Sequence, residues 1–263
     1  MSAANMEPTP TVATLISTMQ HRLDTMPPGR EHMVEFLSTY RRTTSAVRQA
    51  IRASAFEDPH WVETLVVHFA HFYLDALDAD LEGVKHVTRP WRLAFDAPAS
   101  SPPLIHVLLG INAHINYDLP QALLAVMPRH EFEDPVVVER RRRDHERIDD
   151  ILSSRVAAEG HELGARVGRP LLDRALTPLH RRSARRLLRE AREKVWLNTL
   201  ELHRARSVGA DCLSARVSEL EMLSAARVAN LRWPRLVLIR LSITGFGVTL
   251  PPTNDNQGVG VGT

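Results

Sequence analysis

The chain has 263 residues, of which 44% are hydrophobic and 24% charged, and its formal net charge is +2. This balance excludes collagen-like, disulfide-stapled and intrinsically disordered chains and is typical of a globular protein with a full core. The single cysteine, Cys212, excludes an internal disulfide and any multi-cysteine zinc or iron–sulfur site, so metal ligands would have to be His, Asp or Glu.

Helical periodicity recurs along most of the chain, because apolar residues repeat at three- and four-residue spacing between turn signals. Two Asp-Pro dipeptides, at residues 58–59 and 134–135, are typical helix starts, since the aspartate caps amides and the proline fits the first turn. The predicted helices cover residues 11–26, 31–55, 58–83, 101–128, 136–156, 171–206 and 211–230.

One proline falls inside a predicted helix. Pro120 lacks an amide hydrogen, so the helix over residues 101–128 is expected to kink or break just after Asp118. No shift in composition and no solenoid-length repeat marks a second domain. The sequence therefore predicts an all-α, single-domain helical bundle of about seven or eight helices over residues 11–250, with disordered tails at residues 1–10 and 251–263.

Neither end of the chain resembles a targeting or membrane segment. The amino-terminal residues lack the basic start and apolar run of a secretory signal, so a cytoplasmic location is expected. The longest apolar stretch, residues 231–250, contains Pro234, Arg235 and Arg240 and falls short of the roughly 20 clean residues that span a bilayer. It is expected to pack as a last helix, with peripheral membrane contact as the alternative.

Histidine and aspartate are repeatedly spaced by four residues, which aims both side chains at one place when the segment is helical. Four such pairs occur, against roughly 0.6 expected from independent placement. His68 adds a third polar group one turn before His71, and an ionised Asp75 on this apolar helix would need a partner. The pairs are His71–Asp75, His114–Asp118, His130–Asp134, which crosses a loop, and His145–Asp149.

The densest polar cluster is the segment GINAHINYDLPQAL, which interrupts an otherwise apolar helix. Such a cluster indicates either a ligand site or a buried hydrogen-bond network that satisfies the carbonyls of the broken helix. For the arginine-rich segment around His145 and Asp149, a solvated ion-paired face is the alternative to a site. The polar residues of the cluster are Asn112, His114, Asn116, Tyr117 and Asp118.

Two longer segments resemble a known family. The string LLGINAHINYDLPQAL, with a Trp-containing connector upstream and SELEMLSAARVANLRWPRLVLIRLSITGFGVTLPP downstream, resembles a bacterial family of uncharacterised helical proteins whose hallmark is an NAHINxDLP segment. The resemblance covers most of the chain and implies a helical fold. It implies no activity.

A shorter segment, HINYDLPQAL, is similar to the His-x-x-x-Asp-(L)-x-Q-P-L-H segment of the zinc-dependent phospholipase C and P1-type nuclease superfamily. Members of that superfamily are all-helical and bind a metal cluster. The similarity implies that His114 is a zinc ligand and Asp118 a bridging carboxylate. It also matches His145 and Asp149 to the second His-x-x-x-Asp/Glu of the superfamily.

This chain departs from the superfamily pattern in two places. The histidine that should follow the aspartate is replaced by apolar residues, and no amino-terminal Trp ligand is present behind the leading Met-Ser. The resemblance therefore implies a smaller cluster with one or two metal ions. His68, His71 or Asp75 would supply the remaining ligands.

The expected function is a metal-dependent enzyme, most simply a hydrolase, that acts on an apolar or lipid-like small molecule with Zn or Fe as its divalent metal. His68, His71, His114, Asp118 and His145 are the expected ligands, and Asp75 or Asp149 the general base. Asn112, Asn116, Tyr117 and Trp196 would complete the pocket, although Trp196 also fits a core position.

Two other functions stay open at this point. One is an oxygen-activating or cyclising enzyme of specialised metabolism, because His and carboxylate ligands also suit non-haem iron. The other is a non-catalytic binding or scaffold protein whose polar cluster is structural. A nucleic-acid partner is not favoured, because no aromatic residues are interleaved with the arginines of residues 140–147 and 181–192.

Overall fold

The computed structural model describes residues 11–84, 86–166, 190–191, 193–232 and 247–253. Every regular element in these ranges is helical, which confirms the predicted all-α bundle. A further helical stretch covers residues 193–208. The labelled helices are α1 Val12–Asp24, α2 Val34–Arg52, α3 Pro59–Leu81, α4 Arg89–Phe95, α5 Pro103–Ala113, α6 Leu119–Val126, α7 Arg129–Glu133, α8 Pro135–Arg166 and α10 Ala210–Leu231.

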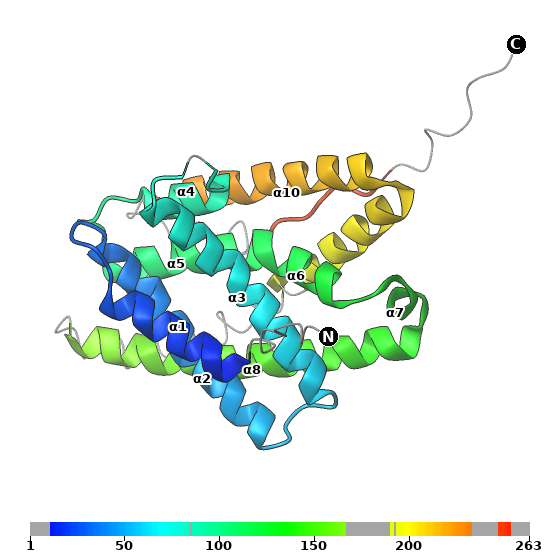
Figure 1. Ribbon diagram of the computed structural model, residues 1–263, viewed down its shortest axis with the longest axis horizontal. Helices are drawn as coiled ribbons and strands as arrows, with labels where there is room; N and C mark the ends of the chain where they lie inside the picture. Colours follow the sequence, from blue (N-terminus) through cyan, green and yellow to red (C-terminus); the bar gives the residue numbers. More distant parts are fainter. Residues whose placement is uncertain (1–10, 85, 167–189, 192, 233–246, 254–263) are drawn as a thin grey trace, which may run out of the picture.

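The bundle is built around α3 and the α5–α6 segment. Figure 1 shows α10 along one edge of the molecule and α8 along the opposite edge, with α3 and α5–α6 between them. Helix α3 packs against α1, α2 and α6, whereas α10 packs against α4 and α5. A π-helical turn, His114–Asp118, joins α5 to α6 and contacts both α3 and α10. The polar cluster of the sequence therefore lies at the centre of the bundle.

The start of α3 is held by polar groups from two helices. The Asp58 carboxylate accepts a hydrogen bond from the Trp61 amide at 3.0 Å, and Pro59 fits the first turn, as the Asp-Pro signal predicts. From α8, the buried Asp144 carboxylate accepts the amides of Glu57 and Asp58, both at 2.8 Å. Asp144 therefore fastens α8 to the first turn of α3.

The arginine-rich helix is not a uniformly solvated face. Arg141 is only 5% exposed, and its guanidinium lies 4.8 Å from the ring centre of Trp61. It donates to Asp58 at 2.6 Å and to Glu131 at 2.8 and 3.0 Å. Buried cations are tolerated when they are paired in this way. Arg141 is thus a structural clamp between α8, α7 and the start of α3.

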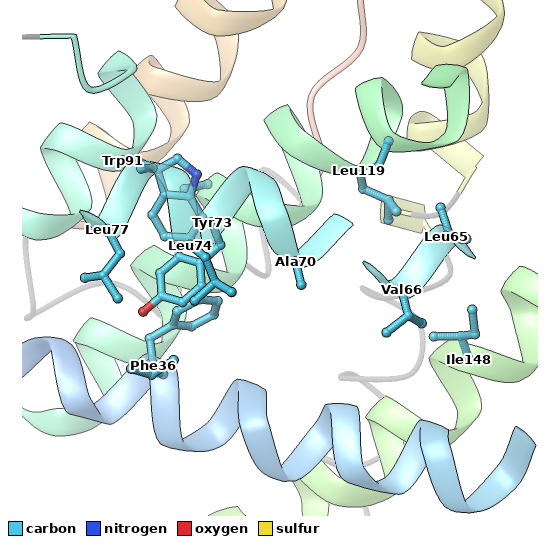
Figure 2. Packing of buried hydrophobic residues seen from close by; sticks show 14 of the residues in the cluster. Phe36, Leu65, Val66, Ala70, Tyr73, Leu74, Leu77, Trp91, Leu119 and Ile148 are labelled. Atoms are coloured by element: carbon cyan, nitrogen blue, oxygen red, sulfur yellow. The ribbon is translucent and has the colours of Figure 1, made fainter. Parts of the chain in front are cut away.

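Aromatic side chains from three helices form the centre of the core. Figure 2 shows Phe36 of α2, Tyr73 of α3 and Trp91 of α4 packed together. The ring centres of Phe36 and Tyr73 are 4.9 Å apart in an edge-to-face arrangement, and those of Tyr73 and Trp91 are 4.8 Å apart. Trp91 is 1% exposed, which explains why the connector expected between residues 83 and 101 contains the short helix α4.

The carboxyl-terminal part differs from expectation. Residues 247–253 have no regular secondary structure, and residues 233–246 of the expected last helix lie outside the described ranges. The expected tail starts at 251, yet Pro251 accepts a hydrogen bond from Arg216 and Thr253 donates to Glu201 at 2.8 Å. Within the described part of the chain, no helix is long and apolar enough to cross a membrane.

Candidate functional site

The site is built on the π-helical turn that precedes Pro120. Because Pro120 has no amide hydrogen to offer Asn116, and its ring would meet that carbonyl, the α-helical pattern cannot continue through this point. The chain widens instead, and the Leu119 amide donates to the His114 carbonyl five residues earlier. The break expected after Asp118 is thus a widened turn, which directs His114 and Asp118 into the core.

His114 and Asp118 form a buried pair with a third partner. Nδ1 of His114 lies 2.8 Å from Oδ2 of Asp118, and the indole nitrogen of Trp91 donates to the same oxygen at 2.8 Å. Their exposed fractions are 3% for His114 and 1% for both Asp118 and Trp91. Trp91 therefore fixes the carboxylate, and the carboxylate fixes the imidazole.

Aromatic rings surround the imidazole. The ring of Phe69 is stacked on that of His114, with centres 3.5 Å apart and an interplanar angle of 6°. Tyr40 meets the imidazole edge-on at 4.7 Å, and Trp91 lies 5.8 Å away. A histidine ring held on several sides in this way has little rotational freedom, so the direction of its second nitrogen is set by packing.

A cavity of about 100 Å³ lies beside His114. Its walls come from α2, α3, α5, the π-helical turn and α8. Most of the lining side chains are apolar or aromatic, which is typical of small-molecule pockets. They are Phe36, Thr39, Tyr40, Thr43, Thr44, Val47, Val66, Phe69, Ile111, His114, Ile115 and Ile148.

Few polar atoms of the cavity wall are available to a ligand. The hydroxyls of Thr43 and Thr44 donate to backbone carbonyls of their own helix, both at 2.9 Å. Among the described residues that line the cavity, two side-chain polar atoms are buried without a hydrogen-bond partner: Nε2 of His114 and the hydroxyl oxygen of Tyr40. Buried polar atoms in native structures are nearly always paired, so these two atoms mark a site.

Burial determines the protonation of the pair. It lowers the pKa of His114 well below its ordinary value, because an imidazolium would lose its water. Burial also raises the pKa of Asp118 well above its ordinary value, against the opposing effect of the Trp91 hydrogen bond. Both shifts favour the uncharged form of each group, so the neutral pair is the favoured state. It holds one proton between Nδ1 and Oδ2 and a second on Nε2 of His114.

The donor set at this place does not fit a metal cluster. Across the part of the chain that the structure describes, no three His, Cys, Asp or Glu side chains gather into a group that could hold a metal ion. Nδ1 of His114 is engaged with Asp118, so the pair offers Nε2 as its remaining imidazole ligand. Zinc sites use three or four protein ligands. The expected set of metal ligands is therefore not assembled by the described residues.

The site residues predicted on α3 do not lie near His114 in the cavity wall. His68, His71 and Asp75 are all exposed, on a solvent-facing side of the helix. The expectation that Asp75 is buried and needs a partner is wrong, because water solvates this face. These three residues are not among those that line the cavity beside His114.

The second predicted pair on α8 is also separate. His145 is 2% exposed, and its Nδ1 accepts a hydrogen bond from the indole nitrogen of Trp196 at 3.2 Å. His145 is therefore not part of a solvated face, and Trp196 occupies a core position at 4% exposure. The side chain of Asp149 lies outside the described residues. Neither His145 nor Trp196 lines the cavity.

Two asparagines, Asn116 of the cluster and Asn198, hold the carboxyl-terminal segment in place. Asn112 donates to Leu108 within its own helix at 3.0 Å, and Asn116 accepts the Val248 amide at 3.1 Å. Asn198 pairs with the backbone on both sides, donating to the Val248 carbonyl at 3.0 Å and accepting the Leu250 amide at 2.8 Å. Asn112 and Asn116 therefore belong to a buried hydrogen-bond network, which is the alternative to a ligand site that the sequence leaves open.

Tyr117 is not among the residues that line the cavity beside His114. It is 6% exposed and belongs to a second apolar cluster, outside the walls of the cavity. Burial raises its pKa to about 12. Its neighbours in that cluster include Leu124, Leu202, Leu220 and Leu250.

Comparison with known protein families assigns the chain to one of them. A model of a family of unknown function, DUF5995, matches residues 12–232. The chain belongs to the DUF5995 family. The family membership agrees with the first of the two resemblances seen in the sequence, whereas nothing supports the link to the phospholipase C and P1-type nuclease superfamily. No curated protein and no solved structure matches the chain.

Several residues of the site in this DUF5995 chain have no obvious signal in the sequence. Tyr40, Phe69 and Trp91 reach His114 from three different helices. One local signal does exist on α2, where Phe36, Tyr40, Thr43, Thr44 and Val47 share one face of the helix. Polar residues on a core-facing stripe indicate a cavity wall, and this pattern could have identified α2.

A glycine controls the position of Phe36, which forms part of the cavity wall. A Cβ atom at Gly110 would lie 2.4 Å from the Phe36 ring, closer than real Cβ atoms approach. We expect Gly110→Ala to lower the free energy of unfolding by about 1–3 kcal/mol, measured by urea denaturation, because the ring must move within a packed core. In a Phe36→Ala background the same substitution should be nearly neutral. An equal loss in both backgrounds would refute the contact.

Proposed function

We propose that this DUF5995 protein binds an apolar small molecule in the cavity beside His114 and uses this histidine as an acid–base group toward the polar part of the molecule. One observation carries the proposal. Nε2 of His114 is buried without a hydrogen-bond partner among the described residues, and His114 lines a largely apolar cavity. An unpaired buried polar atom costs about 1–3 kcal/mol, and a bound ligand would remove that cost.

The hydrogen bonds behind His114 support an acid–base role. A carboxylate on Nδ1 sets which nitrogen faces the ligand, and general acid–base catalysis requires a group held within hydrogen-bond reach of the reacting atom. Asp118 supplies this contact at 2.8 Å, and Trp91 orients Asp118 in turn. The pKa of His114, which burial lowers, keeps the imidazole neutral near neutral pH. Nε2 can then donate its proton without a buried positive charge at rest.

The dimensions and lining of the cavity support an apolar ligand. Its volume of about 100 Å³ is of the same order as apolar protein cavities that bind benzene. Among the lining residues, none is Asp, Glu, Lys or Arg. A ring or a short aliphatic chain with one polar group fits these conditions. A metal ion is not part of the proposal, because the described donors do not form a ligand set.

Two probes of similar shape test the proposal. Phenol and toluene differ by one hydroxyl, and a phenol hydroxyl can either donate to Nε2 or accept from it. We expect His114→Phe to weaken phenol binding by about tenfold relative to toluene binding, as measured by calorimetry, because one hydrogen bond of about 1–1.5 kcal/mol is lost. The phenylalanine keeps a ring against Phe69, and retained toluene binding reports that the variant still has its cavity.

Two results would contradict the proposal. If neither probe binds the wild-type protein, the cavity does not admit small molecules and the proposal fails. If both bind and His114→Phe leaves their ratio unchanged, Nε2 of His114 does not face the ligand. Asp75→Ala on the exposed side of α3 serves as the control, and it should alter neither affinity.

A further inference from the structure

The cavity contains a second buried polar atom, the hydroxyl of Tyr40. This oxygen has no hydrogen-bond partner among the described residues, and Tyr40 lines the same cavity as His114. The two rings meet edge-on with centres 4.7 Å apart. Because Nε2 of His114 also lacks a partner, the two polar atoms do not bond to each other. Two residues in contact, both lining one cavity, thus each carry a buried polar atom without a partner among the described residues.

Packing fixes the tyrosine ring as well as the imidazole. Tyr40 stacks on Phe36 with centres 5.7 Å apart and meets Phe69 edge-on at 6.2 Å. Tyr40 lines the cavity from α2, one turn from Thr43 and Thr44, whose own hydroxyls are bonded to the backbone. The hydroxyl is thus held in place by contacts that do not satisfy it.

Both polar atoms carry a hydrogen to donate. Burial, with a further contribution from Asp118, raises the pKa of Tyr40 well above its ordinary value, so the phenol stays protonated. The neutral His114–Asp118 pair keeps its second proton on Nε2 of His114. Two neutral donors in an apolar cavity suit an oxygen that accepts two hydrogen bonds. A carboxylate would bring a buried charge, and none of the described residues that line the cavity is a Lys or Arg that could pair with it.

We infer that Tyr40 and His114 bind one carbonyl oxygen, so that the ligand class is a neutral, apolar carbonyl compound such as a ketone or an ester. The inference rests on the proposed function, because it concerns the same cavity. It adds a residue, Tyr40, and a chemical class. Two preorganised donors on one carbonyl oxygen polarise the C=O bond and stabilise negative charge that develops on the oxygen.

A ketone and its hydrocarbon analogue test the inference on the full-length protein. Cyclohexanone and methylenecyclohexane have nearly the same shape, but the second has no oxygen. We expect Tyr40→Phe to weaken cyclohexanone binding by about 5- to 10-fold and to leave methylenecyclohexane binding unchanged, because one hydrogen bond is removed. The infrared C=O band of bound cyclohexanone should move to higher frequency in the variant, since a donor to the oxygen is lost.

Tyr73→Phe is the matched control. The Tyr73 hydroxyl is also buried without a partner in the described part of the chain, but Tyr73 does not line this cavity. It should leave both the affinity for cyclohexanone and the C=O band unchanged. Neither substitution should destabilise the fold, because each removes a buried hydroxyl that makes no hydrogen bond to a described residue.

The outcomes separate this inference from the proposed function. If cyclohexanone and methylenecyclohexane both bind and Tyr40→Phe changes neither the affinity nor the band, Tyr40 does not contact the carbonyl and the inference is overturned, while the His114 site stands. If neither probe binds wild-type protein, the cavity is closed to ligands and both fall. Equal effects of Tyr40→Phe and Tyr73→Phe would also overturn it, because they would indicate a general change in packing.

Discussion

Replacing Asp118 with alanine is expected to lower the free energy of unfolding by about 3–5 kcal/mol, the largest loss for any single substitution at this site. Two buried groups depend on the Asp118 carboxyl group, each at 2.8 Å: the Trp91 indole, which donates to it, and Nδ1 of His114, which shares a proton with it. Both are buried where water cannot replace the lost acceptor. The loss is a large fraction of the total stability of a typical domain, about 5–15 kcal/mol. Urea denaturation followed by circular dichroism measures it.

Two controls accompany this prediction. Asp118→Asn keeps a carbonyl oxygen that can accept from Trp91, so its loss should be clearly smaller than that of alanine. Asp75→Ala removes the same side chain from an exposed position of α3 and should change stability by no more than about 0.5 kcal/mol. If Asp118→Ala were no more harmful than Asp75→Ala, the buried triad of Trp91, Asp118 and His114 would not exist in solution.

The second large effect is a pH dependence of stability that comes from the same pair. Between the ordinary pKa values of 3.8 for Asp118 and 6.5 for His114, the unfolded chain carries an ionised Asp118 and an imidazolium, which together hold two protons. The folded neutral pair also holds two. The raised pKa of Asp118 and the lowered pKa of His114 therefore offset each other, and the pair contributes no slope in this window.

Above pH 6.5 the balance changes. The unfolded histidine loses a proton there, whereas the folded pair keeps both of its protons until the raised pKa of Asp118 is reached. The folded state then binds one proton more than the unfolded state, so the free energy of unfolding falls by about 1.4 kcal/mol per pH unit. Below pH 3.8 the unfolded chain gains a third proton, and stability falls again as the pH decreases.

Subtraction isolates this contribution from that of other titrating groups. Unfolding free energies of wild-type protein and the double variant His114→Gln/Asp118→Asn are measured from pH 4.5 to 8.5. Their difference should be flat up to about pH 6.5 and then decline. A difference that stays flat to pH 8.5 would show that the folded pair gives up its proton as readily as the unfolded chain. The buried pair would then carry a negative charge, contrary to the neutral pair described above.

Much of the fold follows from local patterns in the sequence. Helices α2, α3 and α10 coincide with predicted helices to within a few residues, because apolar spacing and the Asp58-Pro59 start signal are local properties. The short helix α4 was not predicted. Its stability comes from burial of Trp91 against residues of other helices, and a single-segment pattern does not contain that information.

The candidate site could be predicted only in part. His114 and Asp118 are identifiable because polar residues at i and i+4 interrupt an apolar helix, and the structure joins them. The same spacing in His71 and Asp75 leads to the wrong side of α3, since spacing determines which residues share a face but not which way that face points.

The partners of His114 show the same limit. Trp91 is 27 residues from Asp118 in sequence, and Tyr40 and Phe69 lie on other helices. Only the tertiary packing brings these rings to one place. The single cysteine and the four-residue spacing of His and Asp predict a metal site with His and carboxylate ligands. The described residues instead assemble a hydrogen-bonded pair inside an aromatic cage.

The most direct measurement of the central claim is the ¹⁵N NMR signal of Nε2 of His114 in protein titrated with phenol. We expect this signal to shift as phenol fills the cavity, because the ligand hydroxyl becomes the hydrogen-bond partner that Nε2 lacks among the described residues. The Nδ1 signal should change little, since Asp118 keeps that nitrogen at 2.8 Å. Saturation with phenol that leaves the Nε2 signal unmoved would contradict a ligand site built on His114.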